Sequence, residues 1–188
     1  MKLSMFFLDG AHTIESMEIC LKWFKEKTSN SNRNRVLIFN LTGERNPEVF
    51  FKQLSKAKFD IVIFVPNVGS DKDSADTVDH ILPTDQQLRR CEAYSKKWSQ
   101  MQSNGKTETI KLFPSFSRAV NFIQNQGMCD ILVTGSIHLI GAALSVLNPT
   151  LNGKSTKIFS FKGFQNLDTI PKKSKVLHRE QITADKRD

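Results

Sequence analysis

Short apolar runs alternate with stretches of helical periodicity over the first 147 residues of the chain. The apolar runs have the length of β-strands and cover Met5–Leu8, Val36–Leu41, Ile61–Pro66, Ile110–Phe113 and Ile131–Val133. Continuous apolar strands separated by helices are typical of a parallel sheet that helices cover on both faces. The pattern therefore predicts an α/β, Rossmann-like domain with a mostly parallel sheet of about five strands.

Each predicted helix follows one of these apolar runs. In the first helix, apolar side chains recur three or four positions apart, and Thr13 stands where an N-cap is expected. The pair Asn46-Pro47 is a start signal for the second helix. Three further helices are expected over 84–103, Phe116–Ile123 and Ile137–Leu147. The last of these is almost wholly apolar, so we expect it to be buried on most sides.

The stretch 67–83 is polar and carries four aspartates, which predicts a loop. A calcium-binding loop would need a central glycine and a closing glutamate, and this stretch does not supply them. From residue 148 onward the apolar pattern ends. We therefore predict a globular domain over 1–148 and a basic, flexible extension over 149–188.

The net charge of +8 is unevenly distributed along the chain. Residues 154–188 carry nine Lys or Arg against four Asp or Glu, whereas residues 1–153 carry eighteen against fifteen. The basic character therefore belongs mainly to the extension, and we expect no nucleic-acid partner. No apolar run reaches the length of about 18 residues that a membrane span needs, and the start of the chain lacks the features of a targeting segment.

The three cysteines, Cys20, Cys91 and Cys129, are far apart in the sequence. An odd number of cysteines without metal-ligand spacing argues against both a disulfide framework and a metal site. We expect buried thiols in a reducing compartment.

A carboxylate and an imidazole lie three residues apart at the exit of the first predicted strand. Asp9 ends the strand, Gly10 permits a tight turn, and His12 precedes the first helix. Open α/β sheets bind ligands at the carboxyl ends of their strands, and helix starts favour anions. Asp9 is thus a candidate acceptor for ribose hydroxyls, and His12 a candidate donor to a phosphate or carboxylate. The alternative is that Asp9 only caps the turn and His12 lies on the surface.

Two further strand exits carry polar residues. Gly43 and Arg45 follow the second strand, and Arg45 could bind an anion. The stretch Thr134–Ser136 follows the fifth strand, with His138 in the next helix. Hydroxyls and a glycine at a helix start can form an anion-binding nest. Ordinary turn formation and helix capping are the alternative at both exits.

The sequence contains no complete motif for phosphate binding or nucleophilic catalysis. The stretch 148–155 ends in Gly-Lys-Ser, but Asn148 stands where a phosphate-binding loop needs glycine, and the stretch follows a helix. Ser136 lacks the glycine two residues earlier that a nucleophile elbow needs. The sequence therefore predicts one half of a nucleotide-using enzyme, with no catalytic residue assigned.

Four segments in order resemble one enzyme family. They are Leu8–Ser16, Val36–Gly43, Phe59–Asn67 and Val133–Leu139. Together they resemble the C-terminal domain of animal-type folylpolyglutamate synthases, whose wider kin are the Mur ligases. The resemblance covers residues 5–147. It implies a monomeric enzyme in which this domain closes over a nucleotide bound by a separate N-terminal domain.

The resemblance implies an ATP-dependent ligase of one-carbon metabolism. In that reaction ATP phosphorylates the γ-carboxyl of a reduced folate, L-glutamate attacks the acyl phosphate through its amine, and ADP and phosphate leave. Carried over by position, Asp9 contacts ATP at its nucleoside end, and His12 faces the phosphates or the incoming glutamate. Ser136 lines the same cleft. Mg²⁺ accompanies ATP and is held mainly by the N-terminal domain.

The resemblance also implies parts that this sequence does not contain. The family's phosphate-binding loop, and an arginine upstream of its Asp-Gly-Ala-His motif, have no counterpart here. We therefore expect a fragment or truncated form that is inactive alone and whose sheet lacks a neighbouring edge strand. The family works in the cytosol and in mitochondria, which gives the expected location. The alternatives are a non-catalytic, Rossmann-like binding module and RNA binding through the basic extension.

Overall fold

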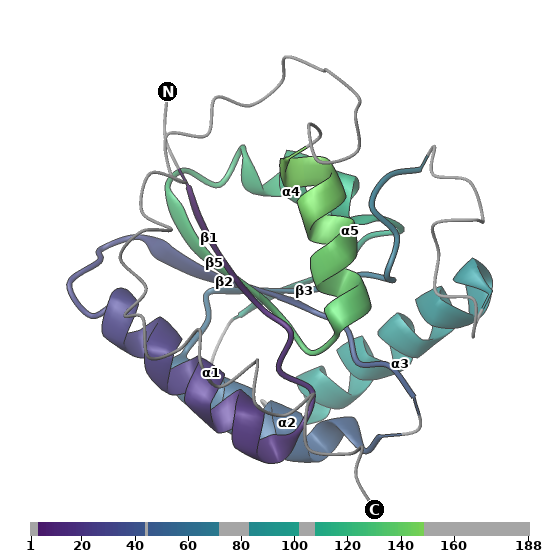
Figure 1. Cartoon of the computed structure of the whole chain (residues 1–188), viewed down its shortest axis with the longest axis horizontal. Helices are drawn as coiled ribbons and strands as arrows, with labels where there is room; N and C mark the ends of the chain where they lie inside the picture. The colour runs from purple at the N-terminus through teal and green to yellow at the C-terminus, as the bar shows by residue number, and fades with distance from the viewer. Residues whose placement is uncertain (1–3, 44, 72–82, 102–107, 149–188) are drawn as a thin grey trace, which may run out of the picture. The chain divides into compact units, whose positions relative to one another are not determined.

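The computed structural model describes residues 4–43, 45–71, 83–101 and 108–148. These residues form a five-stranded sheet in the order β1-β5-β2-β3-β4, with every neighbouring pair parallel (Figure 1). The strands are β1 (Met5–Asp9), β2 (Asn34–Phe39), β3 (Ile61–Phe64), β4 (Thr109–Leu112) and β5 (Cys129–Thr134). The predicted fold class is confirmed.

Helices cover both faces of the sheet (Figure 1). They are α1 (Ile14–Lys27), α2 (Pro47–Leu54), the short 3-10 helix η1 (Ser55–Ala57), α3 (Thr84–Met101), α4 (Phe116–Ile123) and α5 (Ile137–Leu147). The helices α1, α2 and α3 pack on one face, and α4 and α5 on the other. Each helix that the sequence predicts is present.

Successive residues of the central strands pack into two separate hydrophobic cores, one on each face of the sheet. Leu37 and Phe39 of β2 pack with α1, α2 and α3 in a core rich in aromatic rings. Val36 and Ile38 of the same strand pack with α4 and α5 in a mainly aliphatic core. Because both faces of the central strands are buried, their sequences are apolar throughout, as the sequence pattern indicates.

Two predicted strand ends are wrong by two residues. β2 ends at Phe39 and β3 at Phe64, before the apolar runs end at Leu41 and Pro66. After Phe39 the chain leaves the sheet, because the Asn40 side chain accepts a hydrogen bond from the backbone N–H of Leu41 over 2.8 Å. Leu41 is still buried, so burial continues where strand geometry has stopped.

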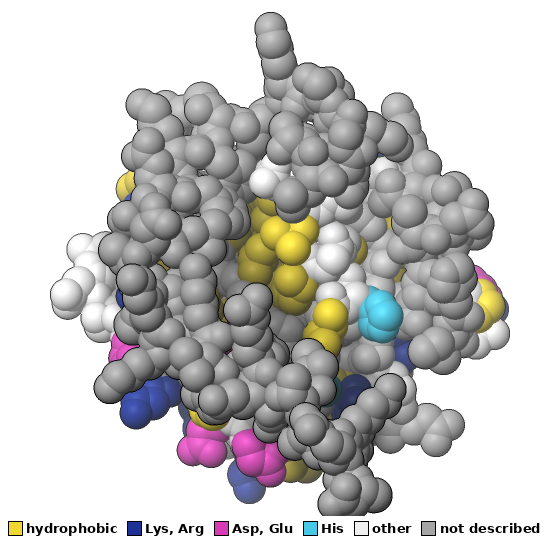
Figure 2. Space-filling model, in the orientation of Figure 1, with side chains coloured by type: hydrophobic (Ala, Val, Ile, Leu, Met, Phe, Trp, Pro, Cys, Tyr) yellow, Lys and Arg dark blue, Asp and Glu magenta, His cyan; other side chains and the backbone are white. Residues whose placement is uncertain are grey.

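The expectation that α5 is buried on most sides is wrong. Only Leu139, Ala143 and Leu147 are buried, while Ile137 is 65% exposed. The reason is the position of α5, whose main contacts among the described residues are with β5, the edge strand β1 and α4. Figure 2 shows hydrophobic side chains gathered near the middle of one face of the molecule.

The chain order makes β5 the point where the direction of winding reverses. From β1 to β4 each crossover helix lies on one face, and α4 then returns along the opposite face to place β5 between β1 and β2. Right-handed crossovers require this change of face. The helices that follow β1, β5 and β2 therefore leave toward opposite faces, which opens a crevice at their carboxyl ends.

Two sequence expectations lie wholly or mainly outside the described residues. The extension 149–188 and residues 72–82 of the polar stretch lie outside the described residues. The described start of that stretch packs on α4, since the backbone N–H groups of Phe116 and Ser117 donate to the carbonyls of Val68 and Gly69. Among the described helices, none combines the length and the apolar character of a membrane span.

Candidate functional site

The three strand exits that the sequence singles out lie side by side. In the sheet register Asp9 at the end of β1 pairs with Thr134 at the end of β5, and Thr134 pairs in turn with Phe39 at the end of β2. Segments more than 90 residues apart in the sequence therefore meet at one edge. This edge, formed by the residues that directly follow β1, β5, β2 and β3, is called the carboxyl edge below.

Asp9 is a half-buried carboxylate that shapes the turn after β1. Its Oδ1 accepts a hydrogen bond from the backbone N–H of Ala11 over 2.9 Å, the geometry of an Asx turn. The Asp9 charge also contributes to the raised pKa of the Cys20 thiol, which places the carboxylate beside α1. The carboxylate is therefore held both by the turn and by the neighbouring Cys20 thiol of α1.

His12 lies at the start of α1 with one ring nitrogen already engaged. Its Nδ1 is 2.9 Å from the carbonyl oxygen of Gly10. Because a carbonyl only accepts, this contact assigns the ring proton to Nδ1 and leaves Nε2 as an acceptor in the neutral ring. The backbone N–H of His12 donates to Ser16 Oγ, which ties the residue to the capping box of α1.

Ser136 reaches the carboxyl edge but is fully buried there. It is the N-cap of α5, and its Oγ accepts a hydrogen bond from the backbone N–H of Leu139 over 3.4 Å. Gly135 beside it has a φ of +101°, and a Cβ at this position would lie 2.1 Å from the carbonyl oxygen of Asn40. The turns after β5 and β2 therefore touch through a position that only glycine can occupy.

Arg45 and His138 are both exposed at this edge. The Nη1 of Arg45 donates to the carbonyl oxygen of Thr42 over 2.7 Å, so the guanidinium is held over its own loop. His138 lies in the first turn of α5, next to the exposed Ile137. Neither side chain contacts Asp9 through a hydrogen bond or ion pair among the described residues.

A buried amide network at the same edge was not singled out by the sequence analysis. Asn40 Nδ2 donates to Asn67 Oδ1 over 3.1 Å, and the backbone N–H of Asn67 donates to Gln87 Oε1 over 2.9 Å. The signal for this network in the sequence is an asparagine one residue after β2 and another three residues after β3. Within the described part of the chain, Asn67 Nδ2 and the Nε and Nη2 atoms of Arg90 are buried without a hydrogen-bond acceptor. Such donors suit an anionic group.

The thiol nearest to the site is not a nucleophile. Burial raises the pKa of Cys20 to about 12, with a further contribution from the Asp9 charge. Burial likewise raises the pKa of Cys91 to about 12, and all three cysteines are buried and free, as expected. In the described ranges no group of three His, Cys, Asp or Glu side chains could hold a metal ion.

Comparisons with known proteins find relatives among the folylpolyglutamate synthases. No protein-family model matches the chain. The mitochondrial folylpolyglutamate synthase of Bos taurus is 27% identical over 212 residues, which covers 78% of this chain and 36% of the relative. The human protein of the same name is 26% identical with the same coverage. Folylpolyglutamate synthase of Saccharomyces cerevisiae (strain YJM789) is 31% identical over 157 residues, which covers 77% of this chain and 28% of the relative.

A solved structure also aligns with the chain. It is the folylpolyglutamate synthase of Mycobacterium tuberculosis complexed with ADP and AMPPCP, at a TM-score of 0.47 and 16% identity, covering 81% of this chain and 30% of the other. The chain spans about a third of the length of the curated relatives that it matches.

Proposed function

Because the chain is a relative of the folylpolyglutamate synthases over about a third of their length, we propose that it forms the part of such a ligase that closes over the nucleotide. In the proposed reaction a carboxylate oxygen of a reduced folate takes the γ-phosphoryl group of ATP, and ADP leaves. The amine of L-glutamate then attacks the acyl carbon. The new C–N bond forms as the C–O bond to phosphate breaks, and the amine loses a proton.

The observation that carries this proposal is the meeting of three strand exits at the point where the winding reverses. Asp9, Gly135 and Asn40 come from β1, β5 and β2, and they lie at adjoining places on the carboxyl edge. This is where open α/β sheets hold nucleotides. The surface cavity described below lies at the opposite end of the strands, so it does not compete for this role.

Asp9 is proposed to bind the nucleoside end of ATP. Its Oδ1 is held by the Ala11 N–H, so the carboxylate has a fixed orientation before any ligand arrives. A preorganised carboxylate can accept hydrogen bonds from two neighbouring ribose hydroxyls with little further loss of side-chain freedom. Its geometry, half buried at the end of an edge strand, supports this role.

His12 is proposed to face the phosphates or the incoming glutamate. The contact between Nδ1 and the Gly10 carbonyl fixes the orientation of the ring, so Nε2 is the ring nitrogen that can interact with a ligand. In the neutral ring Nε2 can accept the proton that the glutamate amine must lose, and in the protonated ring it can donate to a phosphate oxygen.

Ser136 is proposed to line the cleft and to fix the start of α5, which forms one side of it. Its hydroxyl caps α5, so the residue fixes the direction in which α5 leaves the sheet. The Mg²⁺ that accompanies ATP would shield phosphate charge, but the described residues offer no ready group of ligands for it. We therefore derive no step through the metal. The bovine and human relatives are named as mitochondrial, and we propose a mitochondrial or cytosolic site of action.

The test is a chimera in which residues 5–148 replace the matched segment of the yeast relative. We expect ATP-dependent addition of labelled L-glutamate to tetrahydrofolate. Asp9→Asn keeps a side-chain oxygen that can accept the hydrogen bond from the Ala11 N–H but removes the negative charge, and it should lower kcat/KM for ATP at least tenfold. Asp85→Asn, on the exposed side of α3, should leave kcat/KM for ATP unchanged. A folded chimera without glutamate addition, or an Asp9→Asn variant with unchanged ATP dependence, contradicts the proposal.

The second candidate is a non-catalytic module that binds a nucleotide or protein partner. The absence of a complete phosphate-binding loop from the sequence favours it. The two functions differ in one observable. The ligase part restores glutamate addition when joined to the rest of the yeast enzyme, and the non-catalytic module leaves the chimera inactive although folded.

A further inference from the structure

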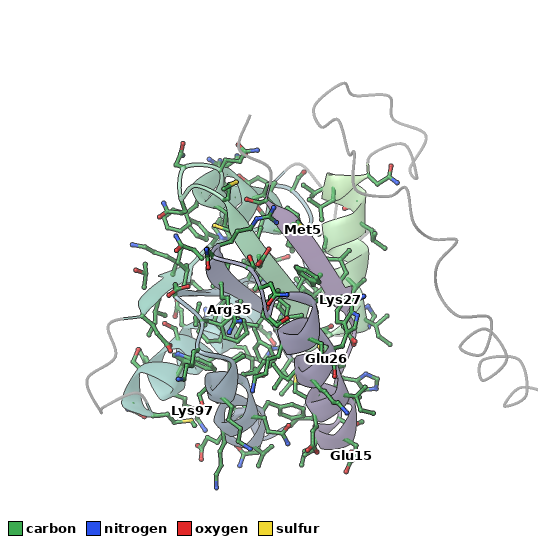
Figure 3. All side chains as sticks on the ribbon, turned by 90° about the vertical axis from the view of Figure 1, so that its left-hand side faces the viewer. Met5, Glu15, Glu26, Lys27, Arg35 and Lys97 are labelled. Carbon is green, nitrogen blue, oxygen red and sulfur yellow. The ribbon has the colours of Figure 1, made fainter. Side chains whose placement is uncertain are left out.

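A cavity of about 560 Å³ opens at the amino end of the sheet, away from the carboxyl edge. Its walls are the start of β1, the start of β5, the end of α1 and the segment 29–33. Figure 3 views the molecule from the side on which Met5, Glu26 and Lys27 lie, and all three line this cavity. None of the residues proposed for the ligase reaction is part of it.

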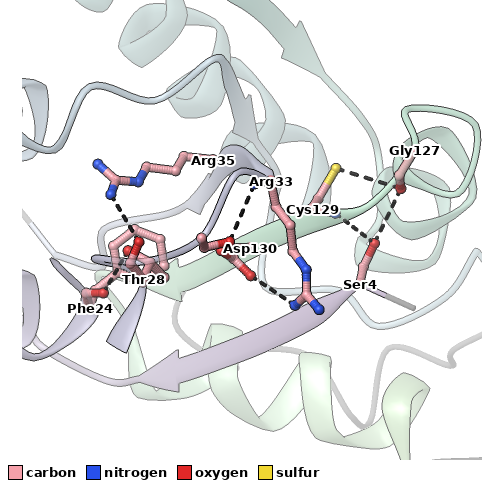
Figure 4. A network of polar contacts seen from close by, with 9 residues as sticks. Ser4, Phe24, Thr28, Arg33, Arg35, Gly127, Cys129 and Asp130 are labelled. Carbon is pink, nitrogen blue, oxygen red and sulfur yellow. Dashed lines mark hydrogen bonds and ion pairs between the residues drawn. The ribbon is translucent and has the colours of Figure 1, made fainter. Parts of the chain in front are cut away.

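The wall of the cavity contains a buried carboxylate. Asp130 is 2% exposed, although it lies in a strand that is otherwise apolar or neutral. Its Oδ1 accepts a hydrogen bond from Arg33 Nη1 over 3.2 Å (Figure 4). Its Oδ2 is buried and has no hydrogen-bond donor within the described part of the chain. A buried carboxylate oxygen without a donor is unfavourable, so the site is suited to one more N–H group.

The nearby arginine does not provide that donor. Arg35 is paired in register with Asp130, but its Nη1 donates to the carbonyl oxygen of Ala57. Its Nη2 donates to the carbonyl oxygen of Thr28 (Figure 4). Its backbone N–H donates to Asp60 Oδ2. Arg33 is committed to the other oxygen of Asp130. Neither Arg33 nor Arg35 therefore donates a hydrogen bond to Asp130 Oδ2.

Two methionines flank the carboxylate on the rim of the cavity. Met5 is the register partner of Asp130 on β1, and Met128 lies two residues before Asp130. They are 47% and 49% exposed, so both side chains are accessible from solvent. Unbranched thioether side chains adapt their shape to an aliphatic group. The carbonyl groups at the end of α1 add negative potential on the same side.

We propose that this cavity binds an ammonium or guanidinium group on a short aliphatic stem. The N–H of the ligand donates to Asp130 Oδ2, and the stem packs between Met5 and Met128. Because Oδ2 is covered, binding requires a side chain to move aside, and the 47%-exposed Met5 is free enough to do so. The cation is either a free alkyl amine or guanidine, or the tip of a Lys or Arg side chain of another protein.

The first experiment uses the full chain with ¹³C-labelled methionine methyl groups. Titration with n-butylammonium or n-butylguanidinium chloride should shift the Met5 and Met128 methyl signals in a saturable way and leave Met17 unchanged. Tetramethylammonium, which has the charge but no N–H, should bind at least tenfold more weakly. Saturable shifts with tetramethylammonium of equal strength, or no saturable shift with any of these ions, overturn the proposal.

Variants identify the carboxylate. Asp130→Asn should weaken n-butylammonium binding at least tenfold, and Asp85→Asn, on an exposed part of α3, should not change it. If Asp130→Asn does not fold, Met5→Lys is the second variant, because it supplies a tethered ammonium beside Asp130 and should abolish binding of the free ion. Unchanged binding in either folded variant overturns the proposal.

A further arm distinguishes the two sources of the cation. The capped peptide acetyl-Gly-Lys-Gly-amide is titrated beside n-butylammonium under the same conditions. Binding of the peptide at least as tight as that of the free amine assigns the site to a protein side chain. Binding of the amine alone assigns it to a small molecule, and binding of neither overturns the proposal.

Discussion

The two ends of the same parallel sheet are held together by different chemistry. At the carboxyl edge, Asp9, Ser136 and Asn40 each accept a hydrogen bond from a nearby backbone N–H. At the amino end, Arg33 bonds Asp130 and Arg35 ties the ends of α1 and η1 together. The carboxyl edge therefore owes its shape to turns and caps, and the amino end owes its shape to charge. A ligand can approach the former without breaking an ion pair.

The largest effect is expected from Gly135→Ala at the carboxyl edge. A Cβ here would lie 2.1 Å from the Asn40 carbonyl oxygen, and the φ of +101° is unfavourable for any L side chain. We expect a loss of about 3 kcal/mol or more in the free energy of unfolding, measured by urea denaturation. The control is Gly43→Ala, whose φ is +75° with open space around it, and which should cost about 1 kcal/mol. Equal costs would refute the close approach of the two turns.

The next effect is expected from Arg33→Ala at the amino end. The change removes the donor of Asp130 Oδ1 and leaves a 2%-exposed carboxylate without its cation. Because Arg33 is partly exposed and solvent can replace some of the lost interaction, we expect a loss of about 2 kcal/mol rather than the larger cost of a fully buried pair. Arg33→Lys, which keeps the charge, should cost less. A loss below about 0.5 kcal/mol for Arg33→Ala would show that charge does not organise this end.

A smaller effect is expected from Asp9→Ala. Loss of the carboxylate removes the acceptor for the Ala11 N–H and should lower stability by about 1 kcal/mol, as for other capping positions. Asp9→Asn keeps an oxygen in the same place and should cost less than half of that. If both variants lose the same stability, the negative charge rather than the turn is what Asp9 contributes to folding.

The smallest effect is expected from Asp71→Asn. Hydrogen bonds from Ser115 and then from Arg118 lower the pKa of Asp71 below its ordinary value of 3.8. A lowered pKa in the folded state adds stability at neutral pH, which is lost as the pH falls through that pKa. This ion pair is exposed, so we expect a difference of about 0.5 kcal/mol from wild type at pH 7. The difference should shrink below pH ~4, and a difference that grows on acidification would contradict the assignment.

The sequence predicts the sheet well because its central strands are apolar on both faces. β5 illustrates this, since all six of its residues are buried. The strand ends are harder to predict, because Leu41 and Val65 remain buried after β2 and β3 have ended. The extent of burial of α5 was also missed, because composition does not show that a helix lies over an edge strand.

The candidate site is predictable only where its residues are marked by local sequence. Asp9 and His12 stand out through local sequence, at a strand exit followed by a helix. The Asn40–Asn67–Gln87 network is not visible in this way, since its partners come from three segments that only the folded sheet brings together. The environment of Asp130 also depends on Met5 and Arg33, which lie 125 and 97 residues away in the sequence.

Hydrogen–deuterium exchange of the yeast chimera, with and without AMPPCP, tests the central claim most directly. The account predicts slower exchange in the segments 9–14 and 134–139 at the carboxyl edge, and unchanged exchange in the segment 29–33 at the amino end. Asp9→Asn should weaken the protection without altering exchange in the absence of nucleotide. Protection confined to 29–33, or absent from both ends in a chimera that binds the nucleotide, would contradict the account.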